Sequence, residues 1–375
     1  MFLVDLVIGT CLYPIFWLLV IFGLLLKYMP NKKNRLPRIG INGFGRIGTV
    51  ALRAILAEKY DVEVAAINSK GDYPIEAYAF QFKYDSVYGR FPGKVSFSDP
   101  EKGGEIGRIL IDDLSIPFLN ETEPDKIPWK NYDVDIVLEC TGAFTDSKAA
   151  LHLKGGASKV VISAPPKDPK IPTYILGVNE DRYQGESIVS NGSCTTNCVA
   201  PIVKLIDEKI GFQEGALTTI HAYTTNQNIV DGMSKDPRRA RAAAINIVPT
   251  FTGAAAAVIA AYPEAAGRFA GTAIRVPVVC GSYSDLTFKL VRNSTIDEVQ
   301  TILENASVQK ELVGRLKISY EPLVSSDILG NSGSCIIDSR MTKIISDDML
   351  SIGAWYDNEY GYSCRLVEMA LHIWK

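Results

Sequence analysis

Cys194 is the residue of this sequence best suited to nucleophilic chemistry. It lies in Ser190–Cys198, a segment of hydroxyl and amide side chains, and Ser193 before it is a residue type that begins helices. The segment that follows has apolar residues at helical spacing, namely Cys198, Pro201, Ile202, Leu205 and Ile206. We therefore expect Cys194 at a helix N-terminus, where unpaired N–H groups lower the pKa of a thiol and favour the thiolate that attacks carbonyl carbons.

A base for this thiol is available in Thr218-Thr219-Ile220-His221, in a chain with only 3 histidines. A general base beside a cysteine is the usual way in which an enzyme activates such a nucleophile. Taken alone, a cysteine or a histidine is more often a buried core residue, so the interpretation depends on the rest of the sequence.

A glycine-rich turn provides a second kind of site. Arg38–Asn42 has the pattern of a short strand, Gly43-Phe44-Gly45-Arg46-Ile47-Gly48 follows, and an amphipathic helix begins after it. In this order the first glycine permits a tight turn, the second lets a pyrophosphate approach the backbone, and the third lets helix and strand pack closely. The pattern predicts a dinucleotide site with phosphate at the helix N-terminus.

These segments resemble the phosphorylating glyceraldehyde-3-phosphate dehydrogenase family. The resemblance extends from about Pro37 to the C-terminus, about nine-tenths of the chain. The strings that carry it, in order, are INGFGRIG at Ile41–Gly48, ECTGAF at Glu139–Phe144, SAPP at Ser163–Pro166, SCTTNC at Ser193–Cys198, TTIHAYT at Thr218–Thr224, RRARAAAINIVPTFTGAA at Arg238–Ala255, AIRVPV at Ala273–Val278 and WYDNEYGYS at Trp355–Ser363.

The resemblance and the strand patterns together predict the fold. We expect a doubly wound α/β domain of the Rossmann type that binds NAD(P), over residues 29–193 and completed by 358–375. An α+β catalytic domain with a mixed sheet is expected over 194–357, after an N-terminal transmembrane helix in 1–28. The strands expected from short apolar runs are Val62–Ile67, Ile136–Glu139, Val160–Ser163, Ala216–Ile220, Arg275–Val279 and Ser284–Val291.

The resemblance also implies the reaction and the residues that perform it. Cys194 would attack the aldehyde of glyceraldehyde 3-phosphate, His221 would form an ion pair with it and then act as base, and inorganic phosphate would release the acyl group as 1,3-bisphosphoglycerate. The residues implied for substrate and phosphate are Ser193, Thr195, Thr224, Thr252, Gly253 and Arg275. Those implied for NAD or NADP are Asn42, Gly43, Gly45, Arg46, Ile47, Ser69, Thr141, Ser163, Asn358 and Tyr362.

Two positions leave the choice of cofactor and substrate open. Ser69, with Lys70 beside it, stands where the family has an aspartate that selects NAD, so no carboxylate would repel the 2′-phosphate of NADP. Asn226 stands where the family typically has threonine, and Ala256 where it commonly has lysine. The alternatives are the related erythrose-4-phosphate dehydrogenase, and a membrane-docked, non-catalytic protein of the same fold.

Composition excludes several other classes. A length of 375 residues with 47% hydrophobic residues fits a two-domain globular enzyme. The net charge of −3 does not indicate the basic surface that nucleic-acid binding requires. The 7 cysteines show no paired spacing, which indicates a reducing compartment. Cys194 and Cys198 are too few for a closed zinc site, so we expect no metal. By resemblance, the loop Tyr223–Ile245 contacts a neighbouring subunit and the protein is a homotetramer.

The N-terminus differs from the family. Leu6–Leu26 is a charge-free apolar run of 21 residues, which as a helix spans roughly the 30 Å core of a bilayer. Lysine and arginine follow this run and only Asp5 precedes it, so the positive-inside rule places the enzyme on the cytoplasmic face, tethered to the membrane through residues 6–26. The alternative is a protein that begins at Met29.

Overall fold

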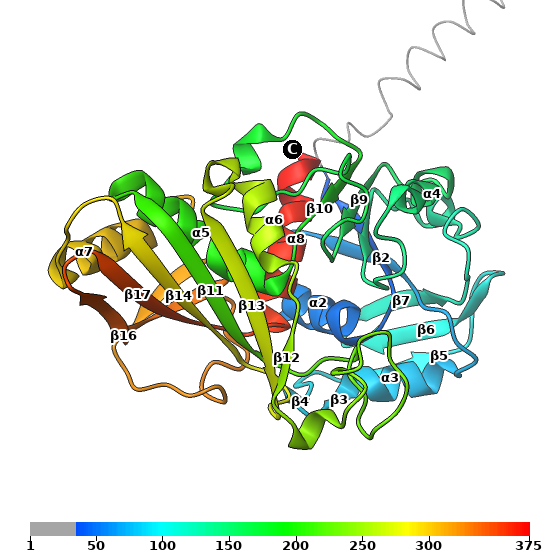
Figure 1. The fold of residues 1–375 in the computed structure, drawn as a ribbon. Coiled ribbons are helices and arrows are strands. Elements are labelled where there is room, and N and C mark those ends of the chain that lie inside the picture. Colours follow the sequence, from blue (N-terminus) through cyan, green and yellow to red (C-terminus); the bar gives the residue numbers. More distant parts are fainter. Residues whose placement is uncertain (1–34) are drawn as a thin grey trace, which may run out of the picture. The chain divides into compact units, whose positions relative to one another are not determined.

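Two sheets organise the part of the chain that the structure describes, residues 35–375 of a computed structural model (Figure 1). The first is eight-stranded, in the order β10-β9-β8-β1-β2-β7-β6-β5. Its strands are β1 (Arg38–Asn42), β2 (Glu63–Asn68), β5 (Val95–Ser98), β6 (Glu105–Ile111), β7 (Leu114–Leu119), β8 (Ile136–Glu139), β9 (Lys159–Ile162) and β10 (Ile188–Ser190).

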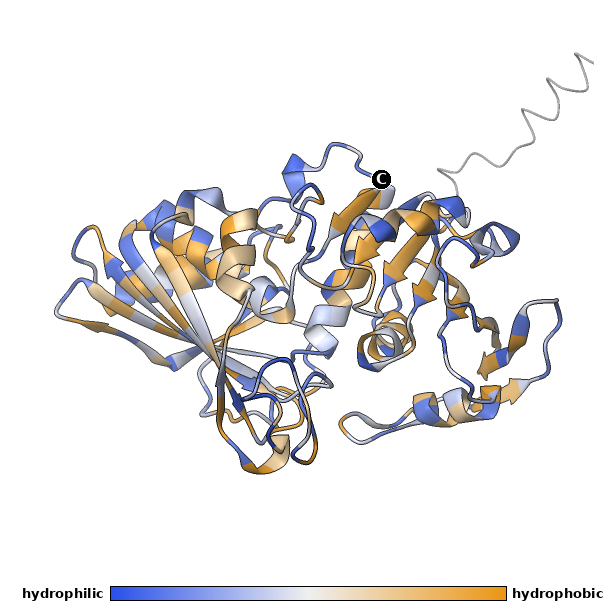
Figure 2. Ribbon diagram, turned by 45° about the vertical axis from the view of Figure 1, so that its right-hand side comes forward, coloured by the Kyte–Doolittle hydropathy of each residue, from blue (hydrophilic) through white to orange (hydrophobic). Residues whose placement is uncertain are grey.

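The strands from β10 to β7 are parallel and carry apolar residues on both faces, as a doubly wound sheet requires. Ile39, Ile41 and Leu138 pack on one face with helices α2, α3 and α8, whereas Val137 and Val160 face Trp129 on the other. Figure 2 shows hydrophobic residues concentrated in these strands. The helices of this part are α2 (Arg46–Ala57), α3 (Ile75–Lys83), α4 (Leu151–Lys154) and α8 (Tyr360–Trp374).

The sequence analysis missed the antiparallel part of this sheet. Strands β5, β6 and β7 form a meander whose last strand pairs in parallel with β2. Buried residues of β6 alternate with half-buried ones, the pattern of a strand with one covered face. A small hairpin, β3 (Tyr84–Asp85) with β4 (Gly89–Arg90), lies between α3 and this meander in sequence.

The second sheet is mixed, as predicted, and has seven strands in the order β12-β13-β11-β14-β17-β16-β15. The pairs β11–β13 and β15–β16 are parallel and the others antiparallel. Helices α5 (Cys194–Lys209), α6 (Ala254–Ala261) and α7 (Ile296–Ser307) share one apolar core with it. Its strands are β11 (Phe212–Ala222), β12 (Val248–Thr250), β13 (Phe269–Val276), β14 (Ser282–Leu290), β15 (Leu316–Ser319), β16 (Cys335–Ile345) and β17 (Met349–Tyr356).

One predicted strand boundary in this sheet is wrong. The expected run Arg275–Val279 is instead the end of β13, which stops at Val276. Pro277 has no N–H to donate to a neighbouring strand, so the ladder ends before it. The chain then reaches β14 through a turn at Gly281, whose φ is 91°.

Residues Pro37–Trp374 form one compact unit. The domain limits proposed at 193/194 and 357/358 stay a prediction. Within residues 35–375 no helix is long and apolar enough to cross a membrane. The predicted span at Leu6–Leu26, and with it the whole proposed segment 1–28, lies outside the described residues.

Candidate active site

A cavity of about 360 Å³ brings together most of the residues predicted to do chemistry. Its walls come from the glycine-rich turn, the end of β9, the start of α5, the end of β11, β13 and the segment before α8. The residues that line it are Arg46, Ile47, Ser163, Ala164, Pro165, Ser193, Cys194, His221, Thr224, Thr225, Asn226, Arg275, Asn358, Glu359 and Tyr362.

Cys194 is the first residue of α5, as predicted from the sequence. Ser193 is the N-cap, and its hydroxyl accepts a hydrogen bond from the N–H of Thr196. The sulfur of Cys194 lies 3.4 Å from Nε2 of His221, so nucleophile and base are within direct reach of each other. His221 is the next-to-last residue of β11, so the first turn of helix α5 lies beside the end of that strand.

Strand register places Arg275 beside His221, because the two residues are partners in the parallel pair β11–β13. The Nη1 atom of Arg275 donates 2.8 Å to the carbonyl oxygen of Ala222. Nδ1 of His221 lies 2.7 Å from the same oxygen. Nη1 of Arg275 lies 2.9 Å from Nδ1 as well, so this nitrogen has one neighbour that only accepts and one that only donates. With the proton on Nδ1, Nε2 is unprotonated and faces the thiol, which is the tautomer a base needs.

The ion pair expected between Cys194 and His221 stays a prediction, and burial acts against it. Burial raises the pKa of the Cys194 thiol, although the nearby Arg275 charge and hydrogen bonds from Thr195 act in the opposite direction. Burial, followed by the Arg275 charge, lowers the pKa of His221 to about 3. A helix start alone does not decide a thiol's pKa, because removal from water disfavours both the thiolate and the imidazolium.

Arg275 itself is a half-buried cation without a carboxylate partner among the described residues. Its Nε has no hydrogen-bond partner there either. Burial lowers its pKa, and the Cys194 thiolate would act in the opposite direction. A guanidinium held in this way is suited to an anion, since phosphate binds its fork bidentately and supplies the missing charge.

The glycine-rich turn fits a dinucleotide phosphate. Gly43 has a φ of 94°, and a Cβ built on Gly48 would lie 2.0 Å from the carbonyl oxygen of Gly43. A Cβ on Gly45 would meet nothing within 4 Å, so this side of the turn is open. Gly45 is the N-cap of α2, and no side chain caps the N–H groups that follow it. These donors, which include those of Arg46 and Ile47, are available to an anion.

The side chain of Arg46 has a different function from its backbone. Its guanidinium bridges Asp85 of the small hairpin and Glu359 before α8, with Nε 3.0 Å from a Glu359 oxygen. Burial by itself would lower the pKa of Arg46, but the hydrogen bonds and charges of the two carboxylates outweigh it and raise the pKa. The residue therefore ties the turn to two distant segments.

Asn42 and Thr141 lie behind the turn and do not line the cavity. Asn42 donates 2.6 Å to a buried Glu139 carboxylate oxygen and accepts from Asn68 at 2.8 Å. The N–H of Thr141 donates 2.8 Å to the second oxygen of Glu139, and His152 lies 2.9 Å from the first. This network joins the ends of β1, β2 and β8. Asn42 is buried, whereas Thr141 is exposed.

Other predicted residues also lie away from the cavity. The hydroxyl of Thr195 points inward, 2.8 Å from the Tyr356 hydroxyl. Thr252 accepts a hydrogen bond from the N–H of Ala254, and Gly253 is the exposed N-cap of α6. Ser69 follows the end of β2 and is half-buried. Ser163, Thr224 and Tyr362 do line the cavity, and the hydroxyl of Tyr362 donates 3.1 Å to the Gly192 carbonyl.

The sequence analysis did not select four cavity residues: Ala164, Pro165, Thr225 and Glu359. Each stands next to a selected residue, inside strings that had already been singled out. Asn226, which had been noted as a departure from the family, lines the cavity as well. Adjacency in sequence was thus the available signal, and only strand and turn geometry show which neighbour faces inward.

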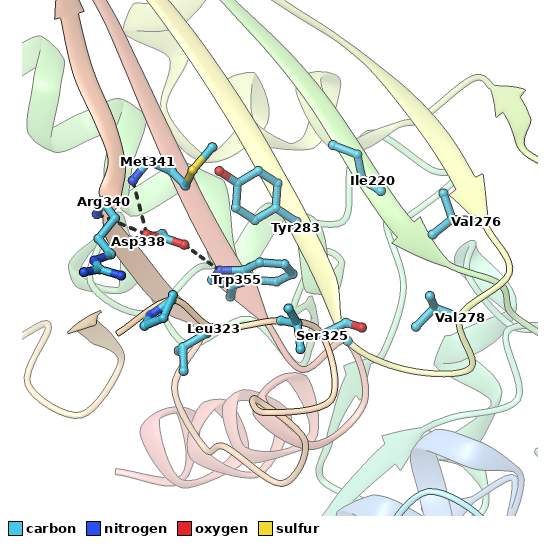
Figure 3. A pocket seen from close by; sticks show the side chains of 13 residues that line it. Ile220, Val276, Val278, Tyr283, Leu323, Ser325, Asp338, Arg340, Met341 and Trp355 are labelled. Carbon is cyan, nitrogen blue, oxygen red and sulfur yellow. Dashed lines mark hydrogen bonds between the residues drawn. The ribbon is translucent and has the colours of Figure 1, made fainter. Parts of the chain in front are cut away.

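A larger cavity, of about 620 Å³, opens on another part of the second sheet (Figure 3). Ile220 faces it, whereas the next residue, His221, faces the catalytic cavity, because side chains alternate along a strand. Its buried carboxylate, Asp338, accepts 3.0 Å from the Trp355 indole. None of its lining residues, all in the described part of the chain, is a cysteine or histidine. This cavity therefore has no thiol–imidazole pair like that of Cys194 and His221.

Metal chemistry has no support in the described residues, where no three His, Cys, Asp or Glu side chains are placed to hold an ion.

Comparison with known proteins gives matches along most of the chain. Residues 37–147 match the family model described as "Glyceraldehyde 3-phosphate dehydrogenase, NAD binding domain", and residues 193–358 match the one for its C-terminal domain. The chain is 45% identical over 339 residues to "Glyceraldehyde-3-phosphate dehydrogenase 2" of Streptomyces avermitilis, covering 90% of this chain and 98% of that protein. It is 46% identical over 344 residues to "Glyceraldehyde-3-phosphate dehydrogenase" of Mycobacterium bovis, with the same coverage.

Removing the Arg275 charge should make the thiol harder to ionise. In Arg275→Gln we expect the pKa of Cys194 to rise by roughly one to three units, the usual effect of losing an opposite charge at short range. The rate of iodoacetamide alkylation at Cys194, measured against pH, should reach its midpoint at a higher pH than in the wild type. Arg275→Lys keeps the charge and is the control. A midpoint that stays or falls in Arg275→Gln would contradict this electrostatic role.

Proposed function

Because the chain belongs to the glyceraldehyde-3-phosphate dehydrogenase family, we propose that Cys194 and His221 carry its reaction. The protein is an oxidoreductase that converts glyceraldehyde 3-phosphate and inorganic phosphate into 1,3-bisphosphoglycerate. NAD(P), for which the family's cofactor domain is present, supplies the hydride acceptor. The observation that carries the assignment of residues is the 3.4 Å contact between the Cys194 sulfur and Nε2 of His221 in a cavity that Arg275 also lines.

In the first half of the reaction the thiol becomes bonded to the aldehyde carbon. The sulfur of Cys194 adds to that carbon while the thiol proton passes by way of Nε2 of His221 to the carbonyl oxygen, which forms a thiohemiacetal. Nε2 then takes the hydroxyl proton as the carbon gives up its hydride. A thioester on Cys194 and a protonated His221 remain. With its proton on Nδ1, next to the Ala222 carbonyl, His221 keeps Nε2 available for both transfers.

In the second half, inorganic phosphate attacks the thioester carbon. The carbon–sulfur bond breaks, the acyl phosphate leaves, His221 returns its proton to the Cys194 sulfur, and the proton of the attacking hydrogen phosphate passes to solvent. Arg275 would hold one of the two phosphates, since its charge has no carboxylate beside it among the described residues. Thr224 and Asn226 line the same cavity and add a hydroxyl and an amide as hydrogen-bond donors.

Two paired substitutions test the assignment of the nucleophile. Cys194→Ser should abolish NAD(P)H formation from glyceraldehyde 3-phosphate and phosphate, because a serine hydroxyl beside a neutral imidazole is a much weaker nucleophile. Cys198→Ser should keep most of the activity, because Cys198 is fully buried one helical turn away. His221→Asn should lower kcat roughly 10²- to 10⁴-fold. Comparable activity in the two serine variants would overturn the assignment.

The same assay decides between the related substrates. Asn226 keeps erythrose 4-phosphate open as an alternative, since an amide there changes the donors around the substrate. Glyceraldehyde 3-phosphate should give the higher kcat/KM. A higher kcat/KM with erythrose 4-phosphate would favour the alternative, and absence of turnover with both would favour a non-catalytic protein.

Cofactor choice is the second proposal. Ser69 follows β2, and Lys70 beside it is exposed. Neither residue has a carboxylate that would repel the 2′-phosphate of NADP. We expect measurable turnover with NADP as well as with NAD. Ser69→Asp should shift the ratio of kcat/KM values toward NAD, because a carboxylate accepts from the ribose hydroxyls and repels phosphate. A wild type that does not use NADP at all would refute this reading of Ser69.

A homotetramer is the third proposal. The segment between β11 and α6 exposes large apolar side chains: Ile229 is 82%, Met233 97% and Phe251 95% exposed. The open 620 Å³ cavity adds a second apolar face, with the rings of Tyr283 and Trp355 4.6 Å apart at its wall. Such surfaces are typical of protein interfaces. Subunits of the same chain are the proposed partners at both faces.

A membrane tether is the fourth proposal. It rests on the charge-free sequence Leu6–Leu26 and the basic residues that follow it. The apolar run is long enough to span a bilayer, and the flanking charges favour a cytoplasmic catalytic domain.

Full-length protein and a chain that begins at Met29 test the third and fourth proposals together. The full-length protein should stay with membranes through high-salt and carbonate washes, because the apolar segment binds by burial and not by charge. The shorter chain should be recovered in the soluble fraction, fully active and with the mass of a tetramer by light scattering. A mature N-terminus at Met29 or Pro30, found by mass spectrometry of native protein, would remove the tether and leave the enzyme assignment intact.

A further inference from the structure

Ser282 lies just outside the catalytic cavity, and its hydroxyl connects two groups that act in it. The residue begins β14 and is only 1% exposed. Its Oγ accepts a hydrogen bond from the N–H of Ala222 at 3.1 Å. An N–H can only donate, so the hydroxyl's own proton is left for its other neighbour, Oδ1 of Asn358, at 2.8 Å.

This second bond settles which end of the Asn358 amide faces the cavity. The backbone N–H of Gly281 also donates to Oδ1, at 3.1 Å, which identifies that atom as oxygen. The Cys280 thiol also donates to this oxygen, at 3.8 Å. With Oδ1 held by these three donors, the Nδ2 group is directed away from them, and Asn358 lines the cavity. Asn358 therefore presents hydrogen-bond donors to whatever binds there.

The first bond reaches the catalytic base. Ala222 follows His221 in β11, and its carbonyl oxygen lies 2.7 Å from Nδ1 of His221 and 2.8 Å from Nη1 of Arg275. The same short backbone segment is thus held on its N–H side by Ser282 and on its carbonyl side by the imidazole and the guanidinium. One hydroxyl joins this segment to Asn358.

We propose that Ser282 is a positioning residue for the reaction, which orients the Asn358 amide toward the carboxamide of the nicotinamide ring and ties it to the backbone beside His221. The inference rests on the proposed function, because it takes Asn358 as a cofactor ligand. Ser282 does not line the cavity and acts only through its two partners.

Direct binding of two ligands tests the proposal. Ser282→Ala should raise the dissociation constant of NAD about 5- to 10-fold, roughly the effect of one buried hydrogen bond, when measured by titration calorimetry. The dissociation constant of ADP-ribose, which has no nicotinamide, should change less than about twofold. The matched control is Ser284→Ala, since Ser284 is buried in the same strand and its Oγ has no hydrogen-bond partner among the described residues. It should change neither constant.

A second set of variants separates positioning from folding. In an Asn358→Ala background, Ser282→Ala should add little to the loss of NAD affinity, because its partner is already absent. Ser282→Cys keeps a weaker donor of similar size and should give an intermediate NAD constant with ADP-ribose binding intact. It also serves if the alanine variant does not fold.

Three outcomes would overturn the inference: equal weakening of NAD and ADP-ribose, a full additional loss in the Asn358→Ala background, or unchanged NAD affinity in a folded Ser282→Ala protein. A failure of the proposed function itself is a different result, in which wild-type protein neither binds NAD(P) nor oxidises the aldehyde. The two failures are therefore distinguished by the wild-type measurements.

Discussion

The register between β11 and β13 is the constraint on which the active site depends. It makes His221 and Arg275 neighbours on adjacent strands, although they are far apart in sequence. A shift of β13 by one residue would turn Arg275 to the opposite face of the sheet from His221, the face where Ile220 now lines a different cavity. Helix α5 then needs only to begin beside the end of β11 for its first residue, Cys194, to contact the imidazole. The packed core under α5, α6 and α7 holds that contact in place.

Burial gives this site its electrostatic character. Removing a thiol, an imidazole and a guanidinium from water disfavours every charged form, so burial raises the pKa of Cys194 and lowers that of His221. Arg275 retains its charge because a guanidinium does not lose its proton in proteins. The positive charge of Arg275 is therefore not balanced by a carboxylate beside it among the described residues. A phosphate would supply the balancing charge, and a thiolate would benefit from the same arginine, so substrate binding and nucleophile formation draw on one positive group.

Three successive residues before α8 connect the two sheets to this cavity. Asp357 accepts from the N–H groups of Glu359 and Tyr360 at the start of α8, and its other oxygen accepts from Gly330 at 2.8 Å. Asn358 faces the cavity, and Glu359 pairs with Arg46 of the glycine-rich turn. Each side chain thus contacts a different element. The segment positions the cofactor turn and the catalytic strands relative to each other without a long interface between them.

Local signals in the sequence determined much of the molecule. The helix start at Cys194, the glycine turn with its strand and helix, and the strands β1 and β8 could all be read from short runs, because capping and periodicity depend on neighbouring residues. The antiparallel extension of the first sheet was missed, although only two residues separate β6 from β7. The inward turn of Thr195, the network that holds Asn42 and the bridge made by Ser282 were missed because contacts between distant segments leave no local mark. The effect of burial on the pKa of Cys194 was missed too, because a helix N-terminus is local whereas burial belongs to the whole fold. The sequence thus indicated which residues are suited to chemistry, and the tertiary structure decided their pKa shifts and their partners, since both depend on strand register and removal from water.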